Sequence, residues 1–331
     1  MVVFWGLFSF LHQTGCRIKN WLYARGIKRP SRSPIPVISV GNISFGGTEK
    51  TPLSIELLSW LLSLGLRPAL ISRGYRGRWE RSGGVVSAGN GPLTGWREAG
   101  DEPALIARKL PGAGVFVGKR RIDSCREARD MGFQVAVLDD GFQHRRLHRD
   151  LDIVLINPAE IPALREPLSS LERADLILVR NGPRAGRVEK SLLTVKVLPY
   201  RVRLDGFASL DGKDAGPGDR FKGKKILAFC GIAKPQRFFE LLEGSGAHIL
   251  GRFAFPDHFP YPQPARKKLM EAFRESGAES AVTTEKDAVK FDPAGEFQPG
   301  FPVFALKIKI ELEDAFFERV RTALKPYCPG I

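Results

Sequence analysis

The chain has 331 residues, of which 43% are hydrophobic and 26% are charged; this composition excludes a disordered chain and suits about two globular domains. It carries 51 Lys and Arg against 36 Asp and Glu, and the formal net charge of +15 predicts an anionic partner: nucleic acid, a phosphorylated substrate or an acidic membrane surface. The four cysteines form no CxxC pair, which argues against a structural zinc site or a disulfide framework and suits a reducing cytoplasm.

The first 48 residues contain no Asp or Glu. An apolar run from Met1 to Leu11 precedes a group of basic residues, and it is too short to cross a bilayer as a helix. It also lacks the basic start and the cleavage site of a signal peptide. Apolar residues recur at helical spacing, and two tryptophans accompany them: Phe4, Trp5, Phe8, Leu11, Ile18, Trp21 and Leu22. We therefore predict an amphipathic, membrane-associating helix over residues 1–30; the alternative is a helix that packs on the protein's own core.

Residues 31–190 alternate short apolar strands with helices. The pattern predicts strands at Val37–Val40, Ala69–Ser72, Val135–Leu138, Ile153–Ile156 and Leu176–Val179, and helices at Leu53–Leu64 and Glu102–Lys109. Continuous apolar strands separated by helices indicate an α/β fold, with a parallel sheet that is covered on both faces.

The pattern changes after residue 190. Alternating Val, Leu and Arg with several glycines predict a β-ribbon linker over residues 191–220. Residues 221–331 predict a second, smaller α/β domain. Its expected strands are Ile226–Cys230, Ile249–Phe255, Ala281–Thr284 and Val303–Ile310, and its helices lie near Pro235–Glu243, Pro264–Ser276 and Glu313–Leu324.

The strongest local signal is VGNISFGGTEKTP at residues 40–52. A buried strand leads into a Gly-rich turn and then into a helix, which is the P-loop arrangement, in which backbone N–H groups and the helix N-terminus cradle phosphates. Lys50 would reach the β- and γ-phosphates, and the Thr51 hydroxyl would ligate Mg²⁺. Glu49 departs from the pattern, which has Gly before the Lys, and an incidental Gly-rich turn is the alternative. The predicted ATP-binding residues are Ser44, Phe45, Gly46, Gly47, Thr48, Glu49, Lys50 and Thr51.

A second buried strand ends at Asp139 and Asp140. Carboxylates at the C-terminal end of such a strand face the P-loop across a doubly wound sheet, so we predict that both hold Mg²⁺ together with Thr51. His144 and several arginines follow and suit phosphate groups. A tight turn and a solvated basic loop are the alternatives.

Three further segments carry charged residues that are candidates for a catalytic role. Asp101 stands at a helix start, either as an N-cap or as a carboxylate over the site. His258, beside Asp257 in a Pro-bounded loop, is a candidate partner for proton transfer. Residues 283–290, TTEKDAVK, end a strand with dense charge, and their alternative role is an ordinary capped helix start.

Taken together, the motifs resemble those of the tetraacyldisaccharide 4′-kinases, the lipid A 4′-kinases of Gram-negative bacteria. The resemblance covers nearly the whole chain in order: VGNISFGGTEKTP, LISRGYRGR, GDEPALIA, VGKRR, VLDDGFQHRRLHRDLDIVLIN, LREPLSSLERAD, CGIAKPQRFF, FPDHFPY and TTEKDAVKF. It implies a P-loop NTPase-like kinase domain and a second α/β domain, with ATP between them. The implied reaction is Mg²⁺-dependent transfer of the ATP γ-phosphoryl group to the 4′-hydroxyl of a tetraacylated glucosamine disaccharide 1-phosphate, which gives the bisphosphorylated lipid A precursor.

The resemblance also implies roles for single residues. It places the catalytic Asp at Asp101 and its supporting His at His258, with Lys50 as the P-loop lysine. Substrate contacts fall at Tyr75, Arg121, His144, Arg165 and Glu166. The implied location is the cytoplasmic face of the inner membrane, as a peripheral protein whose partners are the lipid substrate and the anionic membrane surface, with no nucleic acid and no obligate protein partner.

Two other functions remain open from the residues alone. One is another P-loop NTPase, including a GTPase in which Thr284 to Asp287 (TEKD) reads guanine. The other is a basic nucleic-acid-binding protein, against which the lack of a recognition motif counts.

Overall fold

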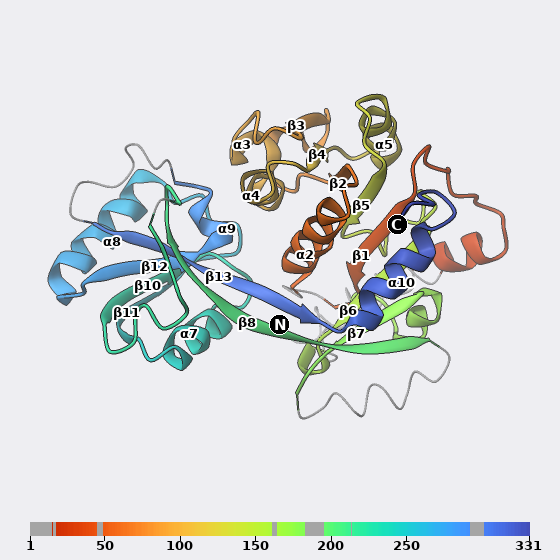
Figure 1. Cartoon of the computed structure of the whole chain (residues 1–331). Coiled ribbons are helices and arrows are strands. Elements are labelled where there is room, and N and C mark those ends of the chain that lie inside the picture. The colour runs from red at the N-terminus through yellow and green to blue at the C-terminus, as the bar shows by residue number, and fades with distance from the viewer. Residues whose placement is uncertain are drawn as a thin grey trace.

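The computed structural model describes residues 15, 18–44, 49–160, 164–182, 195–212, 214–291 and 301–331. Two α/β units lie side by side, and a long pair of strands runs from one to the other (Figure 1).

The first unit is built on a parallel sheet, as predicted. Its strands are β1 (Val37–Asn42), β2 (Pro68–Ser72), β3 (Gly84–Ala88), β4 (Gly114–Val117), β5 (Val135–Asp139), β6 (Leu151–Ile156) and β7 (Leu176–Arg180). They lie in the order β7-β6-β1-β5-β2-β4-β3, and only the edge strand β3 runs antiparallel to its neighbour. All six residues of β1 are buried, because the sheet is covered on both faces.

Helices cover the two faces of this sheet. Ile38 of β1 packs with Leu57 of α2 (Lys50–Ser63) and Ile106 of α4 (Asp101–Lys109) on one face. Val37, which points the other way, packs with Cys125 of α5 (Arg121–Asp130). The shorter elements are α3 (Trp96–Ala99) and the 3₁₀ turns η1 (Arg78–Glu80), η2 (Pro158–Glu160) and η3 (Leu168–Arg173).

The second unit repeats this construction on a smaller scale. Its parallel strands β10 (Lys225–Cys230), β11 (His248–Ala254) and β12 (Ser280–Thr284) lie in the order β11-β10-β12. Helix α7 (Pro235–Gly244) packs Phe238 on one face, and α8 (Gln263–Ser276) packs Leu269 on the other. The short helix α9 (Glu285–Ala288) follows β12 directly.

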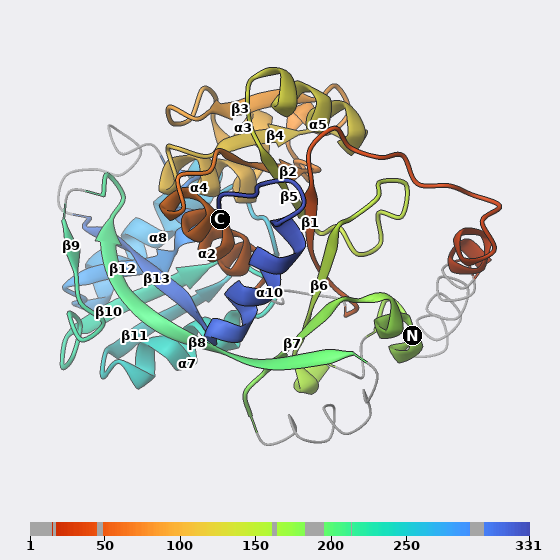
Figure 2. The same ribbon diagram turned by 45° about the vertical axis from the view of Figure 1, so that its right-hand side comes forward.

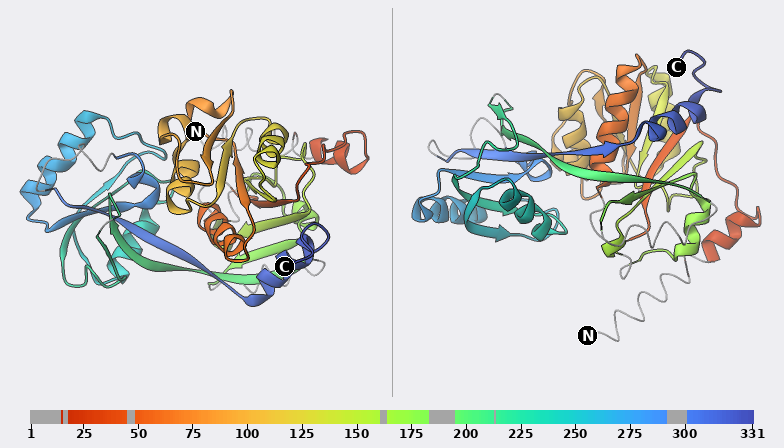
Figure 3. Two further views of the ribbon diagram at one scale, coloured as in Figure 1. Left: turned by 45° about the horizontal axis from the view of Figure 1, so that its top comes forward. Right: turned by 60° about the horizontal axis from the view of Figure 1, so that its bottom comes forward.

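The connection between the units differs from the prediction. A ribbon does form, but its strands are β8 (Lys196–Ser209) and β13 (Val303–Leu312), which come from distant parts of the chain and pair antiparallel from Tyr200–Leu312 to Ser209–Phe304. Among the described residues of the range 191–220, β8 pairs only with the two-residue strand β9 (Ala215–Gly216). Figure 3 shows β8 and β13 passing together from one unit to the other. The start of β8 also pairs with β7, so the sheet is continuous through both units.

The predicted C-terminal domain, residues 221–331, ends too late, because its last helix belongs to the first unit. After β13 the chain returns to the first unit as α10 (Asp314–Leu324), beside β1 and α2 (Figures 1 and 2). Phe316 and Val320 of α10 are fully buried in the same cluster as Leu57 of α2. The last helix therefore closes the first core.

Only part of the predicted N-terminal helix can be compared with the structure. Phe4, Trp5, Phe8 and Leu11 lie outside the described residues, whereas residues 18–24 are helical. The side chains of Ile18 and Trp21 are 57% and 53% exposed, so neither packs into a core. Across the ranges that the structure describes, no helix is long and apolar enough to cross a membrane.

Candidate active site

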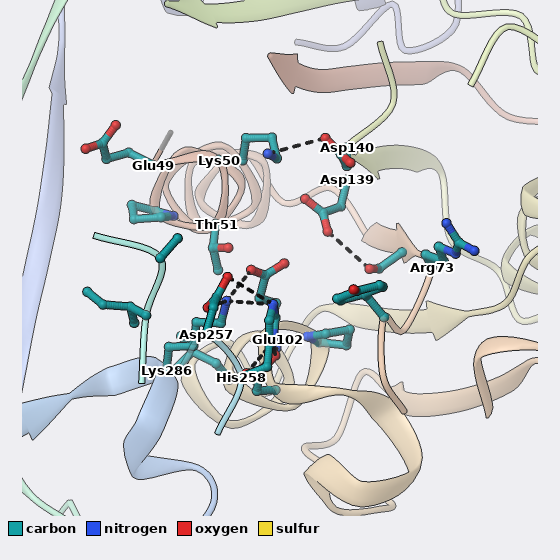
Figure 4. A pocket seen from close by; sticks show the side chains of 18 of the residues that line it. Glu49, Lys50, Thr51, Arg73, Glu102, Asp139, Asp140, Asp257, His258 and Lys286 are labelled. Carbon is teal, nitrogen blue, oxygen red and sulfur yellow. Dashed lines mark hydrogen bonds and ion pairs between the residues drawn. The ribbon is translucent and has the colours of Figure 1, made fainter. Parts of the chain in front are cut away.

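The start of α2 has the backbone that a phosphate-binding loop requires. Glu49, the residue before the helix, is in the left-handed conformation with φ 54° and ψ 25°, which favours glycine. Lys50 and Thr51 open the helix, where the first N–H groups have no partner inside it. Lys50 points toward Asp140, and Thr51 points toward the side that Glu102 and Asp257 line (Figure 4). Phe45, Gly46, Gly47 and Thr48 lie outside the described residues.

Glu49 is held by cations from both units. Its Oε1 accepts hydrogen bonds from Arg180 of β7 at 2.8 Å and from Arg237 of α7 at 2.9 Å, and its Oε2 accepts from the Tyr200 hydroxyl at 3.2 Å. Repulsion from bound phosphate predicts an outward-facing carboxylate that a basic neighbour can pair. The pairing is present, and the Glu49 side chain is 10% exposed because these partners enclose it. Two guanidinium groups compensate the negative charge that Glu49 brings to the loop.

The two carboxylates at the end of β5 have different surroundings. Asp140, with φ 48°, lies 3.3 Å from Lys50 Nζ and accepts hydrogen bonds from Arg165 at 3.1 and 3.3 Å. Burial would raise its pKa, but these cations hold the pKa well below its usual range. Asp139 is 6% exposed and its Oδ2 accepts a hydrogen bond from Ser72 at 3.1 Å, whereas its Oδ1 has no hydrogen-bond partner among the described residues. Burial and the neighbouring charges of Glu102 and Asp140 raise the pKa of Asp139 to about 7.

Asp101 begins α4 and meets the second unit there. The preceding Gly100 has φ 86°, and a Cβ on it would lie 2.9 Å from the Tyr75 carbonyl oxygen, so this turn requires glycine. Asp101 is 4% exposed, and both of its carboxylate oxygens lie within 2.9 Å of His258 Nδ1. Burial would raise its pKa, but the hydrogen bond from His258 and the charges of Lys286, His258 and Lys290 hold the pKa well below its usual range.

These residues open onto one cavity of about 1070 Å³ between the units. The predicted site residues that line it are Glu49, Lys50, Thr51, Tyr75, Asp101, Arg121, Asp139, Asp140, His144, Arg165 and His258. Most of the predicted site is thus assembled from segments far apart in the sequence. The second unit contributes His258 and also lysines and an arginine that we did not predict.

Of the predicted site residues that the structure describes, two do not line the cavity. Ser44 is 4% exposed, and its carbonyl oxygen accepts hydrogen bonds from Asn42 and Arg165. Glu166 is 1% exposed and accepts hydrogen bonds from Arg173 at 2.6 Å and from Asn20 at 3.0 Å. Glu166 thus ties residues 18–24 to the first unit through Asn20, and its contact with substrate stays a prediction.

Comparison with known proteins identifies the family. Residues 2–325 match the family described as Tetraacyldisaccharide-1-P 4′-kinase. A tetraacyldisaccharide 4′-kinase from Pelobacter propionicus is 39% identical over 86% of this chain and 81% of its own length. Another, from Desulfotalea psychrophila, is 36% identical over 94% of this chain and 93% of its own. The chain belongs to the tetraacyldisaccharide-1-P 4′-kinase family.

A solved structure supports the same assignment. The "apo" form of LpxK from Aquifex aeolicus, crystallised in complex with ATP, matches with a TM-score of 0.77 and 29% identity over 97% of both chains. Family membership makes this chain a kinase of lipid A biosynthesis, and the P-loop NTPase-like α/β fold is confirmed.

Residues 284–287 (TEKD), which resemble a guanine-reading motif, have a structural role in this kinase. Asp287 is fully buried, its Oδ2 accepts from Gly231 N–H and Thr284 Oγ1, and its Oδ1 lies 3.0 Å from Lys290 Nζ. Both oxygens are therefore engaged inside the second unit and cannot read a base. The hydroxyl of Thr284 caps α9, as an ordinary helix start would, so the capped-helix interpretation of residues 283–290 is confirmed.

The capped helix also serves the site, which we did not predict. Lys290, which follows α9, lies 3.3 Å from Asp101, and Lys286 donates to Glu102 at 3.0 Å and contacts His258 Nε2 at 3.3 Å. Only the density of charge at the end of β12 signalled these contacts. Periodicity could not show that the segment meets α4.

Proposed function

We propose that the cavity binds ATP and a tetraacylated glucosamine disaccharide 1-phosphate together, and that Asp101 accepts the proton of the 4′-hydroxyl during phosphoryl transfer. The 4′-oxygen forms a bond to the γ-phosphorus of ATP, the bond from that phosphorus to the bridging oxygen breaks, and ADP leaves. The proton moves to the Asp101 carboxylate. The product is the bisphosphorylated lipid A precursor.

The observation that carries this proposal is the bonding of the Asp101–His258 pair. An ionised carboxylate only accepts hydrogen bonds, so His258 Nδ1, which lies within 2.9 Å of both Asp101 oxygens, must be the donor, whereas Nε2 lies 3.3 Å from Lys286 and 3.7 Å from Asp257. The ring proton then sits on Nδ1 and is donated to Asp101. Asp101 can thus take a proton, and His258 orients it and stabilises its charge.

Lys50 and the start of α2 would hold the triphosphate. A helix N-terminus favours bound anions, and a lysine in this position reaches the transferred group. Asp140 holds Lys50 in place, because its carboxylate already pairs with Lys50 and Arg165. Charge neutralisation and positioning supply most of the catalysis in phosphoryl transfer.

The residues present fit a bound Mg²⁺. The buried Asp139 Oδ1 has no hydrogen-bond partner among the described residues, and burial together with the charges of Glu102 and Asp140 raises the pKa of Asp139. Asp139 and Thr51 would hold the ion, while Asp140 is engaged by its own cations. Mg²⁺ takes few protein ligands and completes its shell with water and phosphate oxygens, and it would neutralise charge on the triphosphate.

The acceptor would enter beside the basic wall of the first unit. Arg121, His144 and Arg165 line this wall, with Tyr75, which is 50% exposed, at its edge. Burial and the charges of nearby arginines lower the pKa of His144 to about 4, so it is neutral at pH 7 and can accept a hydrogen bond from a sugar hydroxyl.

Residues 18–24 suit a membrane surface next to this wall. Lys19 and Tyr23 line the cavity, and Lys19 Nζ donates to the Gln143 carbonyl oxygen at 3.0 Å. Ile18 and Trp21 stay exposed, which an interfacial segment requires. We propose peripheral attachment to the cytoplasmic face of the inner membrane, where an acylated acceptor resides.

The test is phosphoryl transfer itself. The protein is incubated with γ-labelled ATP, Mg²⁺ and the tetraacylated disaccharide 1-phosphate in detergent micelles, with Lys50→Ala as the comparison. We expect a labelled bisphosphorylated lipid from the wild type and strongly reduced labelling from Lys50→Ala. No labelled lipid from the folded wild type would contradict the proposal.

A further inference from the structure

Helix α4 of the first unit and the α9 turn of the second are joined by charged contacts. Besides the Asp101–His258 contact, Asp101 lies 3.3 Å from Lys290, and Glu102 accepts from Lys286 at 3.0 Å. At the far end of α4, Lys109 Nζ donates to both carboxylate oxygens of Glu285, at 2.7 and 3.0 Å. Each pair links one unit to the other.

One of these contacts, between Lys290 and Asp101, involves the proposed base directly. The Lys290 side chain is 1% exposed, and it is shared between Asp101 at 3.3 Å and Asp287 at 3.0 Å. Burying a lysine is costly unless its charge is paired; Asp287 pairs Lys290 within the second unit, and Asp101 supplies a second carboxylate from the first unit. The geometry of Asp101 therefore depends on how α9 lies against α4.

The covalent connection between the units does not fix the position of α9 relative to α4. The units are joined by the ribbon of β8 and β13, in whose middle Arg201, Arg203 and Asp205 are exposed while Ile310 is buried. The pairing of this ribbon shifts register between Lys307 and Ile308, opposite Gly206, which has φ 122°. A two-stranded ribbon with an irregularity bends more easily than a packed sheet. Contacts across the cleft must then set the relative position of α4 and α9.

The Lys109–Glu285 pair joins the C-terminal end of α4 to Glu285, which lines the cavity. Lys109 is the last residue of α4, about 12 Å along the helix axis from Asp101 at 1.5 Å per residue. It does not line the cavity, so its side chain does not touch either substrate there. Its bond to Glu285 is bidentate, and the two side chains are 24% and 15% exposed.

We propose that Lys109 is a positioning residue for the kinase reaction: by binding Glu285 it holds α9 against α4, so that the second unit keeps Asp101 in its working orientation. This inference rests on the proposed role of Asp101 as the proton acceptor. Because a displacement of about 1 Å in a reacting group can cost about a hundredfold in rate, a weak contact far from the chemistry can control turnover.

The experiment compares Lys109→Glu, Lys109→Arg and the swapped pair Lys109→Glu/Glu285→Lys, with kcat and the KM for ATP measured separately. We expect Lys109→Glu to lower kcat by about ten- to a hundredfold with a much smaller change in KM for ATP, because α2 and its loop are untouched. Lys109→Arg should stay close to the wild type, and the swapped pair should recover most of the loss.

Lys109→Gln provides a variant that keeps the fold. Partly exposed ion pairs add little to global stability, so this variant should melt near the wild-type temperature and still lose kcat. The matched control is Lys224→Glu, which breaks a Lys–Glu pair of 3.0 Å that lies within the second unit. It should leave kcat unchanged.

Three results would overturn the inference: kcat of Lys109→Gln within about twofold of the wild type, a swapped pair no better than Lys109→Glu, or a loss of kcat that follows only the fraction of unfolded protein. Asp101→Asn, measured in parallel, separates the two claims. If Asp101→Asn stays active, the proposed base is wrong; if Asp101→Asn is inactive while Lys109→Gln is fully active, only the positioning role fails.

Discussion

Replacement of Glu49 by Gly tests how a carboxylate is tolerated beside a phosphate-binding lysine. The structure gives two opposing effects on stability. Glycine removes a left-handed conformation that costs a side chain about 1–2 kcal/mol. It also removes the carboxylate that Arg180 and Arg237 share, and breaking such a pair costs about 3–5 kcal/mol when it is fully buried. Both arginine side chains are 25% exposed and can regain water, so we expect a net loss of about 1–2 kcal/mol in the free energy of unfolding.

Glu49→Gly should lower stability but strengthen the binding of ATP. Two unit charges about 8 Å apart interact by about 2 kcal/mol at an effective dielectric constant of 20, and physiological salt reduces this to about 1 kcal/mol, which sets the order of the repulsion between Glu49 and a bound triphosphate. Loss of Glu49 also frees two guanidinium groups for the phosphates. We expect Glu49→Gly to bind ATP about five- to tenfold more tightly and to keep its turnover.

Glu49→Gln is the matched control, because it removes the charge and keeps the left-handed side chain. Titration calorimetry with ATP and urea unfolding should show tighter ATP binding in both variants, with Glu49→Gly the more stable of the two. Unchanged ATP affinity in both would refute the charge argument. Loss of turnover in Glu49→Gly would mean that Glu49 has a catalytic or metal-linked role.

Two substitutions and one deletion test other parts of the site. His258→Ala should lower kcat by about ten- to a hundredfold, less than the loss of Asp101, because His258 only orients and stabilises the carboxylate; an equal loss in both variants would contradict this. Ser72→Ala, which removes the donor to Asp139, should raise the Mg²⁺ concentration for half-maximal activity by about tenfold, and an unchanged requirement would argue against Asp139 as a ligand. Removal of residues 1–24 should release the protein from anionic vesicles in a flotation assay, and undiminished binding would place the membrane contact elsewhere.

The sequence was most informative where chemistry depends on neighbours in the chain. The apolar run at β1 followed by the Gly-rich turn predicts a phosphate site, because the loop that follows a parallel strand lies at the edge of the sheet formed by the carboxyl ends of the strands, where ligands bind. Asp139 is the last residue of the adjacent strand β5 and reaches the same edge for the same reason. Strand periodicity and local spacing are therefore enough to bring Lys50 and Asp139 together.

Contacts between distant segments could not be predicted in this way. β8 and β13 are about a hundred residues apart, and each has a pattern that suits many partners, so the ribbon was assigned to one segment. The apolar face of α10 shows only that it must be buried, and not that Leu57 of α2 covers it. The charges of residues 283–290 fit a solvated helix start as well as they fit a segment of the site, and only the position of α4 opposite them distinguishes the two.

The central claim is that Asp101, held by the second unit, accepts the proton of the acceptor hydroxyl. The most direct measurement is the turnover of Asp101→Asn with ATP and the tetraacylated disaccharide 1-phosphate, together with its calorimetric affinity for ATP. The account predicts a fall in kcat of about a hundred- to ten-thousandfold with ATP binding close to the wild type. Turnover within a few-fold of the wild type would contradict it.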